Sequence, residues 1–154
     1  MKDVVYFVIY FSLPMMFCLL NAHSHSSVQG DASITVMEPL VIEGEKDLDF
    51  GAVEIGRGPG SVSTSDEGAA VFNIKGPSSS AFQVVLPAEH SVLMIGPEGR
   101  AIAIESFHSD LSSGQAVLNE QGEFELRVGA THGDIHEETL PGHYQGTFTV
   151  EISY

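Results

Sequence analysis

Apolar residues that recur at every second position are the feature that most constrains the fold of this chain of 154 residues. Such alternation places apolar side chains on one face of a β-strand and polar side chains on the other. The alternating positions are Ile34 and Val36; Ala70, Phe72 and Ile74; Phe82, Val84 and Leu86; Ile102 and Ile104; Phe124, Leu126 and Val128; and Phe148, Val150, Ile152 and Tyr154. No convincing stretch of helical period follows residue 30, so the pattern predicts an all-β domain.

Short segments rich in turn-forming residues separate the predicted strands. They are GRGPG at 56–60, DEG at 66–68, GPSSS at 76–80, GPEGR at 96–100, NEQGE at 119–123 and LPGHY at 140–144. Several strands at this spacing are typical of a sandwich or a barrel, and NEQGE predicts a hairpin that joins QAVL to EFELRV. We predict an antiparallel, immunoglobulin-like (Greek-key) β-sandwich over residues 32–154.

The N-terminal segment has the features of a secretory signal peptide. Lys2 precedes an apolar run over residues 4–20, and the small and polar residues NAHSHSS follow it. This order predicts a signal peptide over residues 1–24, cleaved after Ser24 or, alternatively, after Ala22. A membrane anchor is the rival interpretation, but the run is shorter than the roughly 20 residues of a membrane span, and Pro14 interrupts it.

Signal cleavage would leave an exported protein without a stable membrane span, placed in the periplasm, at the cell surface or outside the cell. Residues 25–31 are predicted to form a flexible, polar mature N-terminus. The single cysteine, Cys18, lies inside the signal segment, so the mature protein would have no disulfide and no thiolate metal site. The net charge of −15 at pH 7 argues against a nucleic-acid partner, because binding to phosphates requires an excess of Lys and Arg.

One histidine-rich and acidic segment, THGDIHEETLPGHY, is the best candidate for a metal site. On an extended strand, His132, Asp134 and His136 would share one face, and imidazole together with carboxylate suits Zn²⁺ or another transition metal. The alternative is a solvated polar loop, which Gly133 and Pro141 favour.

Four acidic residues near the start of the predicted domain alternate in the same way. Glu43, Glu45, Asp47 and Asp49 would share one face of an extended chain, and their oxygens could bind Ca²⁺. Because no EF-hand pattern is present, a solvent-facing acidic strand is the alternative interpretation.

Catalytic motifs are absent from the sequence. No G-x-S-x-G elbow precedes a helix, and the glycine-rich segment at 56–60 lacks the Lys-Ser/Thr pair of a phosphate loop. We therefore expect a protein that is not an enzyme and that requires no cofactor.

Several blocks of the chain together resemble one exported bacterial family. They are ASITVMEPLVIEGEKDLDFGAVEIG, AAVFNIKG, AFQVVLP, EFELRVGAT and PGHYQGTFTVEISY. The family is one of unknown function, similar in pattern to the major subunit of the Mat (common pilus) fimbriae and to spore-coat-U-like fimbrial proteins. The resemblance implies an immunoglobulin-like sandwich and a fimbrial or surface-structural role, and it supplies no catalytic residues. A leucine is expected at the position of His132, which places the strand there in doubt.

The segment ASITV is a candidate donor strand, with Ile34 and Val36 on one face. Fimbrial subunits lend such a strand to a neighbour, so self-association, fimbrial partner subunits and a periplasmic chaperone are the expected partners. The alternative for ASITV is an ordinary first strand within its own domain. The alternative function is a monomeric extracellular binding module for a glycan or a metal ion.

Overall fold

The computed structural model describes residues 26–154, which fall into a segment ending at Ile34 and a compact unit spanning Thr35–Tyr154. The predicted signal peptide over residues 1–24 lies outside the described residues. Within residues 26–154, no helix is long and apolar enough to cross a membrane.

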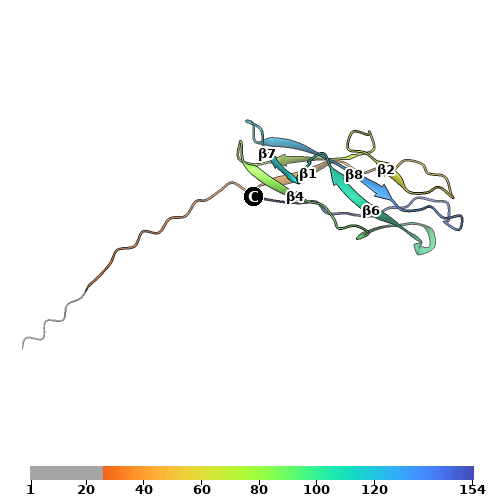
Figure 1. Ribbon diagram of the computed structural model, residues 1–154, viewed down its shortest axis with the longest axis horizontal. Coiled ribbons are helices and arrows are strands. Elements are labelled where there is room, and N and C mark those ends of the chain that lie inside the picture. The colour runs from red at the N-terminus through yellow and green to blue at the C-terminus, as the bar shows by residue number, and fades with distance from the viewer. Residues whose placement is uncertain (1–25) are drawn as a thin grey trace, which may run out of the picture. The chain divides into compact units, whose positions relative to one another are not determined.

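The compact unit is built from nine strands (Figure 1). Their bounds are β1 Val41–Lys46, β2 Gly60–Val62, β3 Ala70–Lys75, β4 Ala81–Val85, β5 Val92–Ile95, β6 Ala101–Ser109, β7 Gln115–Val117, β8 Glu123–His132 and β9 Glu151–Ser153. A single 3-10 turn, Pro97–Gly99, joins β5 to β6. The larger sheet has the order β1-β3-β8-β6-β5, with β2 also paired to β8, and the smaller sheet has the order β7-β4-β9. Every pairing is antiparallel.

The chain passes repeatedly from one sheet to the other. It leaves the larger sheet for β4, returns for β5 and β6, crosses to β7, returns for β8 and ends in β9. Apolar side chains from both sheets meet in one core cluster: Ala70, Ile74, Phe82, Val84, Leu118, Leu126 and Val128. The predicted all-β fold with two antiparallel sheets in a sandwich-like arrangement is therefore confirmed.

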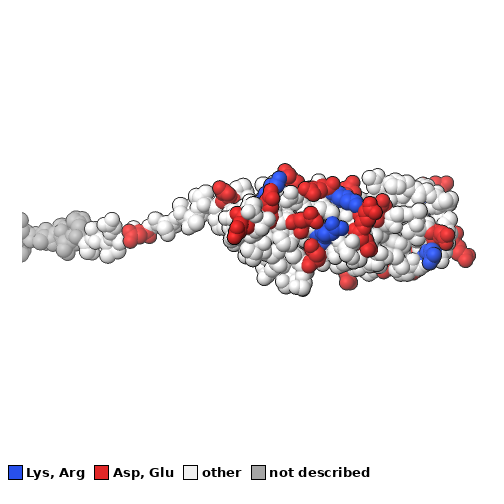
Figure 2. All heavy atoms as spheres, turned by 90° about the horizontal axis from the view of Figure 1, so that it is seen from above, with Lys and Arg blue, Asp and Glu red and all other residues white. Residues whose placement is uncertain are grey.

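Alternation explains which faces of β3 and β8 are buried. Ile74 and Leu126 are fully buried, whereas the intervening positions carry polar partners across the ladder, such as Asn73 opposite Glu125. On the outer face, Lys75 Nζ lies 3.2 Å from Glu43 Oε2. Figure 2 shows the few basic side chains of one face lying among acidic ones. The excess negative charge is thus carried on the surface, away from the core.

Two sequence predictions about strands are wrong. NEQGE does not close a hairpin, because β7 belongs to the smaller sheet and β8 to the larger one. Leu118, directly before this turn, is 2 % exposed and fills the space between the sheets, so the connection arches across the core. The C-terminal strand is also shorter than predicted: only residues 151–153 pair with β4.

The resemblance places the strand at His132 in doubt, because it predicts a leucine there. Strand β8 continues through His132, which pairs with Gly60 of β2 and Ile104 of β6. The imidazole is 3 % exposed and lies edge-on to the Phe50 ring at 5.2 Å. It therefore occupies the inward position at which the resemblance led us to expect leucine.

Arg127 holds the loop between β2 and β3 through its guanidinium group. Its Nε donates to Thr64 O at 2.6 Å and its Nη2 donates to Asp66 O at 3.1 Å. We expect Arg127→Lys to lower the free energy of unfolding by about 1–2 kcal/mol, because an ammonium group cannot make both bonds in this planar geometry. Urea denaturation would measure the loss, and hydrogen exchange should accelerate at Asp66 N–H. Arg100→Lys on the exposed surface is the control, and equal losses in both variants would contradict the assignment.

Candidate functional site

The candidate donor segment is exposed and lies in no strand. Residues 26–40 form no strand, and Ile34 and Val36 are 88 % and 86 % exposed. Val28, which continues the same alternation, is 98 % exposed. The structure therefore does not place ASITV as a paired first strand within the described part of the chain. Ile34 and Val36 are thus exposed at strand spacing, and residues 26–40 form no strand.

The C-terminal segment, residues 145–154, passes from the larger sheet to the smaller one. At its start Gln145 exchanges backbone hydrogen bonds of 2.8 and 3.0 Å with Ile95 of β5. At its end β9 pairs with β4, with Glu151 opposite Val85. Residues 146–150, between these two pairings, belong to no strand ladder. Because β9 is also the last strand of its sheet, the segment offers backbone N–H and C=O groups that another strand could pair with.

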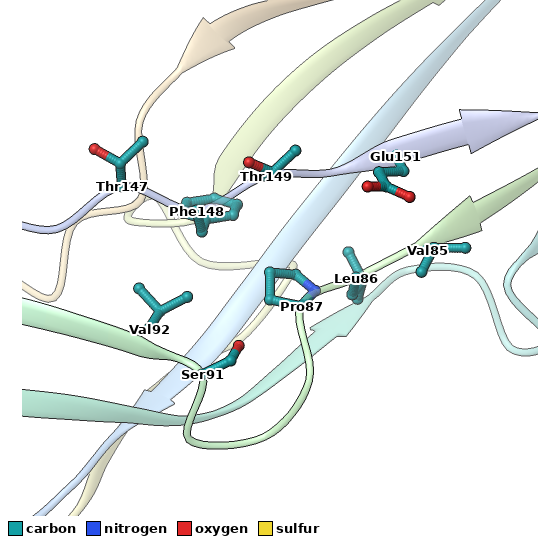
Figure 3. Close-up of a pocket in the computed structure, with 9 residues that line it drawn as sticks. All are labelled: Val85, Leu86, Pro87, Ser91, Val92, Thr147, Phe148, Thr149 and Glu151. Carbon is teal, nitrogen blue, oxygen red and sulfur yellow. The ribbon is translucent and has the colours of Figure 1, made fainter.

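A hollow of about 320 Å³ lies beside this crossing (Figure 3). Phe148 and its neighbours Thr147 and Thr149 line it on one side. The opposite side is formed by the end of β4, the following loop and the start of β5: Val85, Leu86, Pro87, Ser91 and Val92. The wall thus combines apolar side chains with the polar groups of Ser91, Thr147, Thr149 and Glu151.

The apolar side chains near the C-terminal segment are only half-buried. Phe148, Val150 and Ile152 pack against the core cluster but retain partial exposure, unlike Phe82 and Val84 of the adjacent strand. Phe148 lies 5.0 Å from the Phe107 ring and 6.1 Å from the Phe72 ring, measured between centroids. The interior face of the segment is therefore anchored in the core, while its edge remains uncovered.

The start of the domain lies beside its C-terminus. Tyr154 Oη donates a hydrogen bond to Glu38 O, and both Tyr154 and Leu40 lie close to Gly76. The sequence pattern carries no sign that Gln145 joins the C-terminal segment to the larger sheet. The contact between Tyr154 and Glu38 has no sequence signal either, since long-range pairings leave no local pattern in one sequence.

The three candidate metal ligands do not share a face. His132 is buried at the end of β8, whereas Asp134 and His136 are exposed. The strand ends at His132 because the next residues turn toward another loop, where Ile135 N–H donates to Arg57 O at 2.9 Å. Among residues 26–154, no group of three or more His, Cys, Asp or Glu side chains is arranged to hold a metal ion.

The four alternating carboxylates are also divided by the structure. Strand β1 ends at Lys46, with an irregular register between Gly44 and Lys46, so Asp47 and Asp49 lie beyond it. Glu45 accepts a hydrogen bond of 3.3 Å from Asn73, and Asp49 accepts one of 2.8 Å from Gly51 N–H. These carboxylates have local structural roles and do not form the shared face that the spacing predicted.

The geometry defines a small β-sandwich protein with an exposed N-terminal arm and an incompletely paired C-terminal strand. A family model described as a domain of unknown function, DUF4402, matches residues 48–154. The chain belongs to this family. A comparison with curated proteins finds no match.

Proposed function

We propose that this protein is an exported, non-enzymatic surface subunit that assembles by donating its N-terminal arm to another copy. The arm is defined as residues 26–37, with ASITV as the pairing segment. One observation carries the proposal: Ile34 and Val36 are exposed at strand spacing in a chain whose C-terminal segment lacks a strand partner over residues 146–150.

Strand addition would bring these two features together. The arm supplies an extended backbone with alternating apolar side chains, and the C-terminal segment supplies a sheet edge beside half-buried apolar residues. Main-chain hydrogen bonds would give affinity, and side-chain pockets such as the hollow at Phe148 would set the register. Burial of Ile34 and Val36 would stabilise each junction by about 3–6 kcal/mol in total.

The same contact repeated from copy to copy would produce a filament. The arm and the C-terminal segment are different surfaces, so the contact is heterologous and does not close on itself unless the geometry forms a ring. The resemblance to Mat and spore-coat-U-like fimbrial proteins supports this assembly, as does the repeated crossing of the chain between sheets, which is consistent with an immunoglobulin-like class. A periplasmic chaperone that shields the C-terminal segment before assembly would be the expected partner.

Paired substitutions in the arm test the proposal. We expect the purified protein to form open-ended oligomers, and the double variant Ile34→Asp, Val36→Asp to reduce association more than about a hundredfold, because two apolar contacts are lost and two charges would be buried. Size-exclusion chromatography with light scattering, followed by electron microscopy, would measure this.

The matched control is Ser33→Asp, Thr35→Asp, which adds the same charge to the alternate face of the arm. This variant should still assemble. A wild-type protein that stays monomeric at high concentration with its arm protected from protease would contradict the proposal, because the arm would then pair within its own subunit. Equal effects of the two double variants would also contradict it.

A further inference from the structure

A second pocket, of about 380 Å³, lies at the β2 end of the domain. Its walls come from the loop between β1 and β2, from β2 itself and from the end of β8, and its lining includes Phe50, Val53, Glu54, Arg57 and His132. The loop is held to the segment after β8, because Gly56 N–H donates to Ile135 O at 2.8 Å and Ile135 N–H donates to Arg57 O at 2.9 Å. Two backbone hydrogen bonds thus tie the loop that lines the pocket to the segment after β8.

His132 gives this pocket a directed polar group. Its Nδ1 lies 2.7 Å from Gly133 O, and a carbonyl oxygen can only accept, so this contact requires a proton on Nδ1; in that tautomer Nε2 is an acceptor. Nε2 has no hydrogen-bond partner among residues 26–154. No side-chain nitrogen or oxygen in that range is both fully inaccessible and unpaired, so the Nε2 atom is not sealed off completely. His132, a residue that is only 3 % exposed, therefore leaves one acceptor among the groups that line the pocket.

Gly60 makes room for this arrangement. A Cβ atom at residue 60 would lie 2.5 Å from His132 Nε2, so any larger residue would cover the acceptor or displace the ring. Phe50 supplies an apolar wall beside the imidazole, edge-on at 5.2 Å. The imidazole acceptor can bind a sugar hydroxyl, and the aromatic ring of Phe50 can pack against the C–H face of a sugar ring.

The charges around the mouth select among ligands. Arg57 is the one basic side chain among the lining residues, and its Nε lies 3.8 Å from Glu54 Oε2. Asp134 and Glu137 approach the same loop at Gly58 and Gly56. An anionic ligand would meet this acidic rim on a chain of net charge −15. A neutral, hydroxyl-bearing ligand avoids that repulsion. Its hydroxyl groups can accept a hydrogen bond from Arg57 and donate one to Glu54.

We infer that this pocket binds a single neutral sugar residue, with a sugar hydroxyl donating to His132 Nε2. The volume lies at the low end for small-molecule sites and suits one ring better than a longer chain. The inference does not rest on strand donation. No residue lines both this pocket and the hollow at Phe148, although the two lie at the same end of the larger sheet, where Val92 pairs with Ile104 and Ile104 with His132. Figure 1 shows β2 and β7 at opposite ends of the domain.

The first measurement is a titration of the purified protein with methyl glycosides of galactose, mannose and N-acetylglucosamine, followed by two-dimensional amide NMR. We expect saturable shifts for at least one of these neutral sugars at the amides of Gly58, Gly60 and Gly133, and none with N-acetylneuraminic acid. Shifts confined to other regions, stronger binding of the acidic sugar, or no saturable shift with any glycoside would overturn the inference.

Two variants test the acceptor itself. His132→Asn keeps a group that can donate to Gly133 O but lacks the Nε2 acceptor, and Gly60→Ala keeps the imidazole but covers Nε2. Each should weaken sugar binding about tenfold or more, because a buried hydrogen bond is lost. His108→Asn is the control, since His108 lies on β6 opposite Gly129 and does not line the pocket. Wild-type affinity in both test variants would overturn the inference, and the wild-type titration decides the question if either variant fails to fold.

Discussion

Phe82→Ala is expected to lower the free energy of unfolding by about 3–5 kcal/mol, which is a large share of the stability of a domain of this size. Phe82 is 1 % exposed and is among the largest fully buried side chains in the described part of the chain. Its ring also packs edge-on against Phe124 at 5.4 Å, which joins the smaller sheet to the larger one. Its removal would therefore leave a cavity between the sheets and cancel one aromatic contact.

Urea denaturation followed by circular dichroism would measure this loss. Gln83→Ala is the matched control, because Gln83 lies on the same strand with its side chain on the exposed face. We expect that variant to change the free energy of unfolding by less than about 0.5 kcal/mol. A small loss for Phe82→Ala, comparable to the control, would mean that the two sheets do not share one packed core.

Gly122→Ala is expected to be nearly as damaging, by about 2–5 kcal/mol. Gly122 has φ +77°, which disfavours any side chain, and a Cβ atom there would collide with the carbonyl oxygen of Gly76. Gly76 N–H also donates to Gly122 O at 2.9 Å, so the collision would disturb this hydrogen bond between the two loops.

Gly99→Ala separates the cost of a side chain at positive φ from the cost of the collision with a carbonyl oxygen. Gly99 has a similar φ of +73°, but a Cβ atom there would meet nothing within 4 Å. That variant should lose only the backbone term, about 1–2 kcal/mol. Thermal denaturation of the two variants measures the difference, and equal melting temperatures would show that the Gly76 carbonyl can move aside.

Strand periodicity in the sequence was sufficient for the fold class and for the strands in the middle of the chain. Phe72, Ile74 and Phe82 were assigned to strands by alternation, and the structure places all three in strands. Alternation depends on one buried face, so it identifies a strand without identifying the neighbouring strand. For this reason NEQGE was interpreted as a hairpin although it connects two sheets.

The candidate sites were harder to predict than the strands. Residue spacing placed His132, Asp134 and His136 on one face, and this would hold only if the strand continued past His132. The end of β8 is set by hydrogen bonds between residues 56–57 and 135, which are far apart in the sequence. His132 was named as a metal candidate, but its place in a pocket with Gly60 and Phe50 depends on the same tertiary contacts.

The pairing of β9 with β4 has a consequence for how the chain acquires its structure. Residues 83–85 find their partners at residues 151–153, so the smaller sheet cannot gain its third strand until residue 153 has emerged. During synthesis from the N-terminus, Val84 and Leu86 would remain next to an open edge for most of that time. The domain is therefore expected to become fully cooperative only in a late step, after β9 has paired with β4.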